Sequence, residues 1–381
     1  MALPNDFFAE FSPVSKADWL ARITKDLKGR PLDELYWQLS DELHIDPFGH
    51  ADDLAAPALP LTPATLQWEI AEDVDAADPA AANAQALEAL NFGAESLCFH
   101  LPQPASSDTL RRLLEGIHPD YISLHFAGAG LAQNPGAVLA VVESLAREKS
   151  LDPHSLRGVL HYDPAAAPGI QDWRYVADLI AHTREHLPGF RLLTVEGAGE
   201  WQGTEHAADE LAALLRRGNH YLRQLSERGV SPSDAAARLQ FSVAIGPSYF
   251  VEIAKLRAFK LLWLNVLKAW GADAAYPVLD VRFAPEAYVA DENANLIRAT
   301  TMAMSAVLGG ADRLSIRPFD AGAENPARPA AFGRRMARNV QHLLKMESFF
   351  HELPDPAAGS YYVEKLCGQL AEAAWKKFQA G

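Results

Sequence analysis

Residues 239–270 read LQFSVAIGPSYFVEIAKLRAFKLLWLNVLKAW, and this stretch contains the unit from which the fold is built. It begins with an apolar run at residues 239–245, whose length and composition predict a strand buried on both faces. Gly-Pro-Ser at residues 246–248 interrupts the run, and Ser248 is of a residue type that caps helix N-termini. From Tyr249 onward apolar residues recur at helical spacing. The stretch therefore predicts a strand, a short loop and a helix.

Apolar, strand-like runs occur eight times along the chain, and helical patterns separate them. Each return to a neighbouring parallel strand needs a crossover, usually a helix, so this alternation predicts a parallel sheet. Eight such units close a (β/α)8 TIM barrel, and we predict this α/β fold for residues 65–381. An open, doubly wound sheet is the competing fold, but no Gly-rich dinucleotide fingerprint favours it. The predicted strands are residues 66–70, 96–100, 121–126, 157–162, 190–195, 239–245, 277–283 and 313–317. The clearest predicted helices are residues 134–149, 171–186, 206–228, 249–270, 291–308, 334–350 and 363–378.

Residues 1–64 differ from the rest of the chain, and we predict that they form an N-terminal extension arm. Ser15 precedes a helical pattern that ends near Leu27, before the Lys-Gly-Arg-Pro stop signal at residues 28–31. Prolines at 57, 60 and 63 predict a spacer without regular structure. We expect the arm to contact a partner or the main domain; a partly ordered extension is the alternative.

The composition excludes several classes of function. The formal net charge is −15, which argues against nucleic-acid and anionic-membrane partners because both bind basic surfaces. The only two cysteines, Cys98 and Cys367, suggest neither a disulfide framework nor a metal knuckle. No apolar run has the length of a signal sequence or a membrane span. We therefore expect a cytoplasmic protein.

Three histidines, His100, His125 and His161, fall near the ends of three successive predicted strands, with Asp163 close behind. In TIM barrels the strand ends carry the functional residues. Three imidazoles and a carboxylate could hold a zinc ion with a position open for water. Because strand side chains alternate in direction, the register decides whether these imidazoles face inward. Hydrogen-bonded histidines that line a polar barrel mouth are the alternative interpretation.

Two arginines and two glutamates are further candidates near strand ends. Arg282 and Arg317 could hold an anionic ligand, because a guanidinium group binds phosphate or carboxylate through two parallel hydrogen bonds. Structural ion pairs are the alternative for both arginines. Glu196 and Glu200 could form an acid/base pair, although loop carboxylates are far more often solvated.

Several long segments carry a more specific signal. They are FVEIAKLRA at residues 250–258 with Leu262-Trp263, YVADENANLIRATT at 288–301, LGGAD at 308–312, PFD at 318–320, RMARN at 335–339, DPAAGSYYVE at 355–364, Ala374-Trp375 and, near the N-terminus, Trp19 and DLKGRP at 26–31. Together these segments resemble the methylmalonyl-CoA mutase family over nearly the whole chain. The N-terminal segments resemble the arm of the family's small subunit.

This resemblance implies a TIM barrel whose axis admits the CoA chain, followed by a C-terminal cobalamin domain. The implied reaction is a radical rearrangement between methylmalonyl-CoA and succinyl-CoA. The sequence departs from the family pattern at three places. Asp73 stands where the catalytic subunit has a tyrosine just after the first strand. Ala198 and Gly199 stand where a Tyr-His pair follows the fifth strand, and the chain stops at Gly381, which leaves no room for a cobalamin domain.

From these departures we expect a non-catalytic small (beta) subunit that is inactive alone and pairs with a large catalytic mutase subunit in a heterodimer. The resemblance places adenosylcobalamin in that partner, and we expect this chain to bind no cofactor and no metal. Two alternatives remain open. One is a metal-dependent TIM-barrel hydrolase or lyase that uses His100, His125 and His161. The other is a stand-alone acyl-CoA-binding barrel, in which Arg282 or Arg317 holds a CoA thioester.

Overall fold

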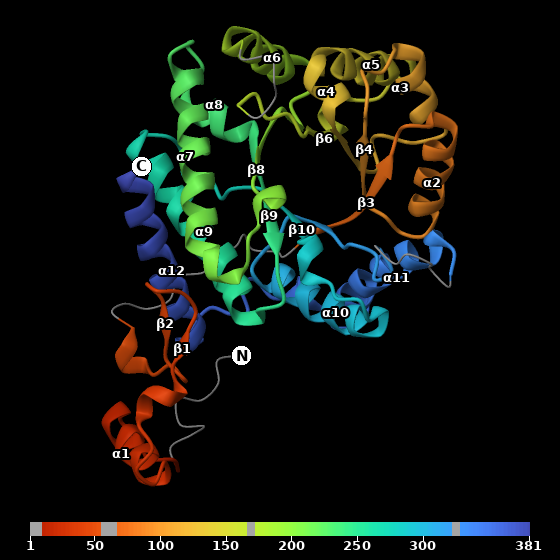
Figure 1. The fold of residues 1–381 in the computed structure, drawn as a ribbon. Helices are drawn as coiled ribbons and strands as arrows, with labels where there is room; N and C mark the ends of the chain where they lie inside the picture. The colour runs from red at the N-terminus through yellow and green to blue at the C-terminus, as the bar shows by residue number, and fades with distance from the viewer. Residues whose placement is uncertain (1–9, 55–66, 166–171, 322–327) are drawn as a thin grey trace.

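The computed structural model describes residues 10–54, 67–165, 172–321 and 328–381, and most of them build one α/β barrel (Figure 1). Parallel strands form a single sheet in the order β7-β6-β5-β4-β3-β11-β10-β9-β8. The strands are β3 (Glu69–Asp75), β4 (Ser96–His100), β5 (Ser123–Ala127), β6 (Arg157–Leu160), β7 (Phe190–Arg191), β8 (Leu193–Glu196), β9 (Leu239–Ile245), β10 (Leu279–Phe283) and β11 (Arg313–Ser315).

The barrel closes through β7 and β8, which are the two halves of its fifth strand. Only Leu192 separates them, and β7 pairs with β6 while β8 pairs with β9. The backbone N–H of Thr194 also donates to the carbonyl of Tyr162, just after β6, at 3.0 Å. The eight strand units therefore surround one interior, and the predicted TIM barrel is confirmed.

The strand–loop–helix unit at residues 239–270 folds as predicted. All seven residues of β9 are buried, and α9 (Tyr249–Ala269) follows after the Gly-Pro-Ser loop. Phe259 and Trp263 of α9 pack on Phe241 of β9 with ring centroids 4.7 Å apart. Neighbouring helices α7, α10 and α12 contact α9, which explains why so few of its residues are exposed.

Helices surround the sheet, and in Figure 1 they form the outer layer of the barrel. No described helix has both the length and the apolar character that a membrane span requires. The remaining helices of the barrel are α2 (Pro79–Asn91), α3 (Ser107–Leu113), α4 (Ala129–Gln133), α5 (Pro135–Glu148), α6 (Trp173–His186), α7 (Ala207–Ser226), α8 (Pro232–Ala237), α10 (Glu292–Leu308), α11 (Ala330–His342) and α12 (Tyr361–Ala380).

The first barrel strand lies further along the chain than predicted. Residues 66–70 were expected, but β3 spans Glu69–Asp75, and residue 66 lies outside the described residues. Glu72 and Asp73 are charged and therefore look like loop residues in the sequence. Both form ion pairs inside the folded protein, with arginines that are far away along the chain. Glu72 faces outward and accepts a hydrogen bond from Arg338 of α11 at 2.6 Å. Asp73 faces the barrel interior. It lies within β3, whereas the sequence comparison placed this position just after the first strand.

Other boundaries also differ from the prediction: β5 and β10 begin two residues later than expected, and β6 ends two residues earlier. The last strand ends at Ser315, two residues early. The helix expected at residues 334–350 ends at His342 and continues as a π-helical turn over Leu343–Glu347.

The N-terminal segment has two parts with different degrees of burial. Helix α1 (Lys16–Asp26) is capped by Ser15, lies away from the barrel in Figure 1 and contains no buried residue. Strands β1 (Trp37–Gln38) and β2 (His44–Ile45) form a small antiparallel pair. Gln369 of α12 donates a hydrogen bond to the His44 carbonyl of β2. Leu39, Leu43 and Ile45 join the hydrophobic core. Prolines 57, 60 and 63 lie outside the described residues.

Candidate functional site

Arg313 of β11 connects four neighbouring strands, β4, β3, β11 and β10, on one side of the barrel interior. Its Nη1 donates to Asp280 Oδ1 on β10 at 2.7 Å, and its Nε donates to Ser96 Oγ on β4 at 2.9 Å. Its Nη2 lies 3.4 Å from Asp73 Oδ1 on β3. The Arg313 side chain is buried, so these partners supply the hydrogen bonds that water would otherwise provide. The interior is therefore held together by charged groups.

Arg282 adds a second guanidinium group to this network. Its Nε donates to Asp280 Oδ2 at 2.9 Å, and its Nη1 lies 3.7 Å from Asp73 Oδ2. Burial alone would raise the pKa of Asp280, but Arg282 and Arg313 hold that pKa well below its ordinary value. Asp280 is fully buried and is ionised at neutral pH because both of its oxygens face a guanidinium group.

His125 and His161 form a buried pair on the other side of the interior. Nδ1 of His125 lies 3.1 Å from Nε2 of His161, and the Ser123 hydroxyl lies 3.0 Å from Nε2 of His125. His161 Nδ1 is 3.9 Å from Asp280 Oδ2. Burial lowers the pKa of both imidazoles, which favours their neutral forms. This is the arrangement expected of hydrogen-bonded interior histidines.

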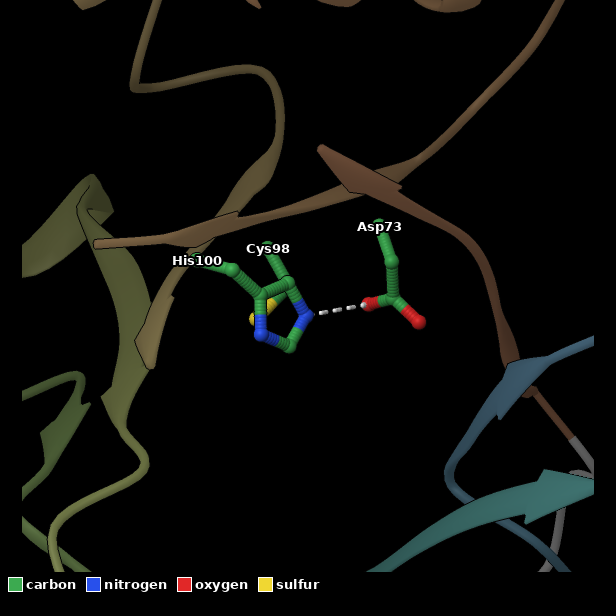
Figure 2. A group of neighbouring side chains, drawn as sticks. All are labelled: Asp73, Cys98 and His100. Carbon is green, nitrogen blue, oxygen red and sulfur yellow. Dashed lines mark ion pairs between the residues drawn. The ribbon is translucent and has the colours of Figure 1, made fainter. Parts of the chain in front are cut away.

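A third group consists of Asp73, Cys98 and His100 (Figure 2). Cys98 and His100 are two residues apart in β4 and so point to the same face, while Asp73 is the register partner of Cys98 on β3. His100 Nε2 lies 3.6 Å from Asp73 Oδ1, which raises the pKa of His100 to about 10. Burial alone would raise the pKa of the Cys98 thiol, but His161 and His100 lower it to about 5.

The three histidines that the sequence singled out therefore belong to two groups. The structure brings His125 and His161 into contact and places His100 beside Asp73, while Cys98 interacts with both His100 and His161. Asp163, the proposed fourth ligand, accepts a hydrogen bond from the Tyr221 hydroxyl. Within the described residues, the three imidazoles do not form one metal cluster.

The two candidate arginines line one cavity of about 300 Å³ at the C-terminal ends of β3, β10 and β11. Arg282 also belongs to the interior ion pairs, whereas Arg317 Nη2 lies 3.5 Å from the Ala321 carbonyl. Arg282 Nη2 and Arg317 Nε are buried and have no hydrogen-bond partner among the described residues. Two guanidinium groups, each with one unpartnered N–H donor, therefore line this cavity.

The loop glutamates have structural partners. The backbone N–H of Gly199 lies 3.3 Å from Glu196 Oε1, and Arg217 pairs with Glu200. This arrangement accounts for both carboxylates as parts of the loop scaffold.

Ala198 and Gly199 lie in a short 3-10 turn immediately after β8, at the C-terminal end of the fifth strand. A Cβ atom added at Gly199 would meet nothing within 4 Å, so the turn has room for a side chain there. The two residues offer no side-chain hydrogen-bond donor or acceptor.

The sequence interpretation missed the roles of Asp280, Arg313 and Cys98. One signal was available: the pairs 280/282 and 98/100 are each two residues apart, which places chemically active side chains on one face of a strand. Residue spacing within one strand does not reveal partners on a neighbouring strand, because Asp73 and Arg313 are 240 residues apart in the sequence.

Comparisons with known proteins agree with this architecture. The family model for methylmalonyl-CoA mutase matches residues 104–380. The methylmalonyl-CoA mutase small subunit of Porphyromonas gingivalis is 31% identical, over 97% of this chain and 63% of that protein. The small subunit of Streptomyces virginiae is 32% identical, over 99% of this chain and 65% of that protein. The large subunit of Streptomyces virginiae is 32% identical, over 71% of this chain and 38% of that protein. The chain thus spans less than two thirds of the length of these relatives. It belongs to the methylmalonyl-CoA mutase family.

Proposed function

We propose that this chain is the non-catalytic small subunit of a methylmalonyl-CoA mutase-type heterodimer. Its partner would be a larger, catalytic subunit that carries adenosylcobalamin and interconverts methylmalonyl-CoA and succinyl-CoA. The observation that carries this proposal is the turn at Ala198 and Gly199, where the family resemblance implies a Tyr-His pair. Relatives named as small subunits, which match nearly the whole chain, support the same assignment.

The turn after the fifth strand lacks the groups that the implied reaction needs. A Tyr-His pair can position the acyl group and donate a hydrogen bond to its carbonyl. Ala198 and Gly199 can do neither, although there is space for a side chain at Gly199. At the other implied catalytic position, the carboxylate of Asp73 faces Arg282 and Arg313. A carboxylate held in this way does not replace a tyrosine hydroxyl.

The buried ion pairs of Arg313 join four neighbouring strands, β4, β3, β11 and β10, on one side of the barrel. We assign these charged residues to the scaffold of the barrel, because breaking such a pair from one side costs about 3–5 kcal/mol.

Cobalamin does not fit the cavity beside Arg282 and Arg317. The cofactor supplies the adenosyl radical when bound. At the C-terminal ends of β3, β10 and β11 the cavity holds about 300 Å³, near the lower limit for a drug-sized ligand, and a corrin ring with its substituents is larger. We therefore place the cofactor in the partner subunit and derive no step through it here. Both cysteines are free and buried, in keeping with a reducing cytoplasm.

The N-terminal arm is our proposed partner contact. Helix α1 buries none of its residues on its own barrel, and Phe11 and Val14 just before it are exposed. Trp19 of α1 contacts Phe48 of its own chain, and the rest of this amphipathic helix is suited to packing on another subunit. An inactive subunit that binds the folded large subunit stabilises it by mass action.

Size-exclusion chromatography with light scattering tests this assembly. The full chain is mixed with the full-length large subunit of the same organism, and a 1:1 complex is expected. Deletion of residues 1–35 retains Leu39, Leu43 and Ile45 in the core, so it should weaken the complex while the barrel stays folded. Two separate elution peaks for the intact chains would overturn the proposed pairing. An unchanged complex after the deletion would overturn the role of the arm alone.

A further inference from the structure

Asp73, Cys98 and His100 offer one oxygen, one sulfur and one nitrogen donor in a single cluster (Figure 2). These ligand atoms all lie within 4.8 Å of one another. Two adjacent, hydrogen-bonded strands of the barrel, β3 and β4, hold all three residues. The donor geometry therefore rests on a rigid part of the fold and not on a mobile loop.

The separation of the donors is suited to a shared ion. His100 Nε2 and Asp73 Oδ1 are 3.6 Å apart, which is longer than a hydrogen bond. Two such ligands on one tetrahedral zinc ion, each about 2.0–2.1 Å from the metal, lie roughly 3.3 Å apart. Small side-chain shifts would therefore bring both donors to bonding distance.

The neighbours of Asp73 already orient it for this role. Ser315 donates its hydroxyl proton to Asp73 Oδ2, and Arg282 Nη1 lies 3.7 Å from the same oxygen. Oδ1 is left facing His100, with Arg313 Nη2 3.4 Å away. Hydrogen bonds of this kind to the second carboxylate oxygen are typical of metal ligands, because they fix the orientation of the first oxygen.

The mixture of donors selects the class of ion. Thiolate and imidazole ligands suit zinc and related transition metals, whereas magnesium and calcium prefer oxygen donors alone. Asp73 also lines the cavity of about 300 Å³ that contains the unpartnered N–H groups of Arg282 and Arg317. A fourth ligand on the ion, water or a small anion, would have room and hydrogen-bond donors on that side.

We propose that Asp73, Cys98 and His100 bind one zinc-type divalent transition metal ion, with a fourth position open toward the cavity. The site differs from the three-histidine cluster considered above, since His125 and His161 are not among its ligands. It also goes beyond the proposed subunit role, because it holds whether or not the chain pairs with a large subunit.

Cobalt titration of the purified full chain tests the site, since Co²⁺ takes similar ligands and reports them by its colour. We expect one equivalent of Co²⁺ to bind, with a thiolate-to-cobalt charge-transfer band that Zn²⁺ abolishes by competition. Cys98→Ser should remove the band. The matched control is Cys367→Ser, which changes the other buried cysteine, in α12, and should leave the band intact.

A second variant guards against a folding artefact at the buried Cys98. His100 is partly exposed, and His100→Ala should weaken Co²⁺ binding by at least about 100-fold, because even outer-shell partners of metal ligands are worth about 10–100-fold. Circular dichroism shows whether each variant is folded. Absence of stoichiometric Co²⁺ binding would overturn the proposal. Retention of the band in folded Cys98→Ser, or its loss in Cys367→Ser, would do the same.

Discussion

Asp280 supplies the negative charge that compensates the two buried arginines, Arg282 and Arg313. It is fully buried, and its two oxygens accept hydrogen bonds from Arg282 at 2.9 Å and Arg313 at 2.7 Å. A buried ion pair is costly to break from one side, because the remaining charge is left without compensation. The charged interior is therefore a condition for the stability of this barrel.

Replacement of this carboxylate should destabilise the whole barrel. Asp280→Asn removes the negative charge between Arg282 and Arg313, and we expect a loss of about 3–5 kcal/mol in the free energy of unfolding. Urea denaturation at pH 7 measures this loss. The control is Asp26→Asn, which breaks an exposed i,i+4 pair with Arg22 and should leave the urea midpoint unchanged. Equal midpoints for the two variants would contradict the role of Asp280.

The same carboxylate should make stability depend on pH in the acid range. The folded state holds the pKa of Asp280 well below the ordinary value of about 3.9. As pH falls through that value, the unfolded chain takes up the proton first, so the stabilisation present above about pH 4 declines. The difference in unfolding free energy between wild type and Asp280→Asn should therefore shrink from pH 6 to pH 3. A constant difference over this range would show that Asp280 is not the source.

Helix α1 illustrates what local sequence rules determine. The Ser15 hydroxyl oxygen accepts a hydrogen bond from the Asp18 backbone N–H at 3.1 Å, and the Asp18 carboxylate accepts one from the Ser15 backbone N–H. Such a capping box is readable from the sequence alone. α1 buries no residue, so its stability depends on its own hydrogen bonds and on contacts outside the core, which join Trp19 to Phe48 and Lys16 to Asp53.

Loss of the cap should loosen α1 without affecting the barrel. Ser15→Ala should shift the opening equilibrium of α1 by about 2- to 30-fold, the effect of a lost N-cap. Amide hydrogen exchange over residues 16–26 measures this shift. Thr24→Ala, which removes a hydroxyl that bonds to the Leu20 carbonyl, provides a control inside the same helix. Increased exchange in the barrel strands would contradict the independence of α1.

The elements that could be predicted are those whose pattern is local. The run at residues 239–245 is apolar throughout because both of its faces are covered, and the helix after it shows its own period. β3 was displaced in the prediction because Glu72 and Asp73 look like solvent-exposed charges. Their partners Arg338 and Arg313 are 266 and 240 residues away. No local pattern contains this information.

The candidate site shows the same limit. The sequence identified His100, His125 and His161 as strand-end residues, but it could not assign each imidazole to its neighbours. The register places Cys98 of β4 beside both Asp73 of β3 and His125 of β5. The side-chain contacts, and not the register alone, pair His125 with His161 and place His100 beside Asp73. The Cys98/His100 spacing was readable, and its significance becomes clear only with Asp73 beside it on β3.

At the scale of the whole molecule, the barrel is closed, but the turn after its fifth strand has Ala198 and Gly199 where the family resemblance implies a Tyr-His pair. Eight strand units close around an interior held by Arg282, Arg313 and Asp280, while the turn at Ala198 and Gly199 has no side chain able to act on an acyl group. The barrel thus provides the scaffold, and α1 extends from it without a buried residue. Our proposal of an assembly role rests on these features together.

Turnover measured with and without the partner tests the central claim most directly. The purified full chain is assayed with adenosylcobalamin and methylmalonyl-CoA, first alone and then with the full-length large subunit of the same organism. We predict no succinyl-CoA above background from this chain alone, and turnover once the large subunit is present. Succinyl-CoA formation by this chain alone would contradict the account.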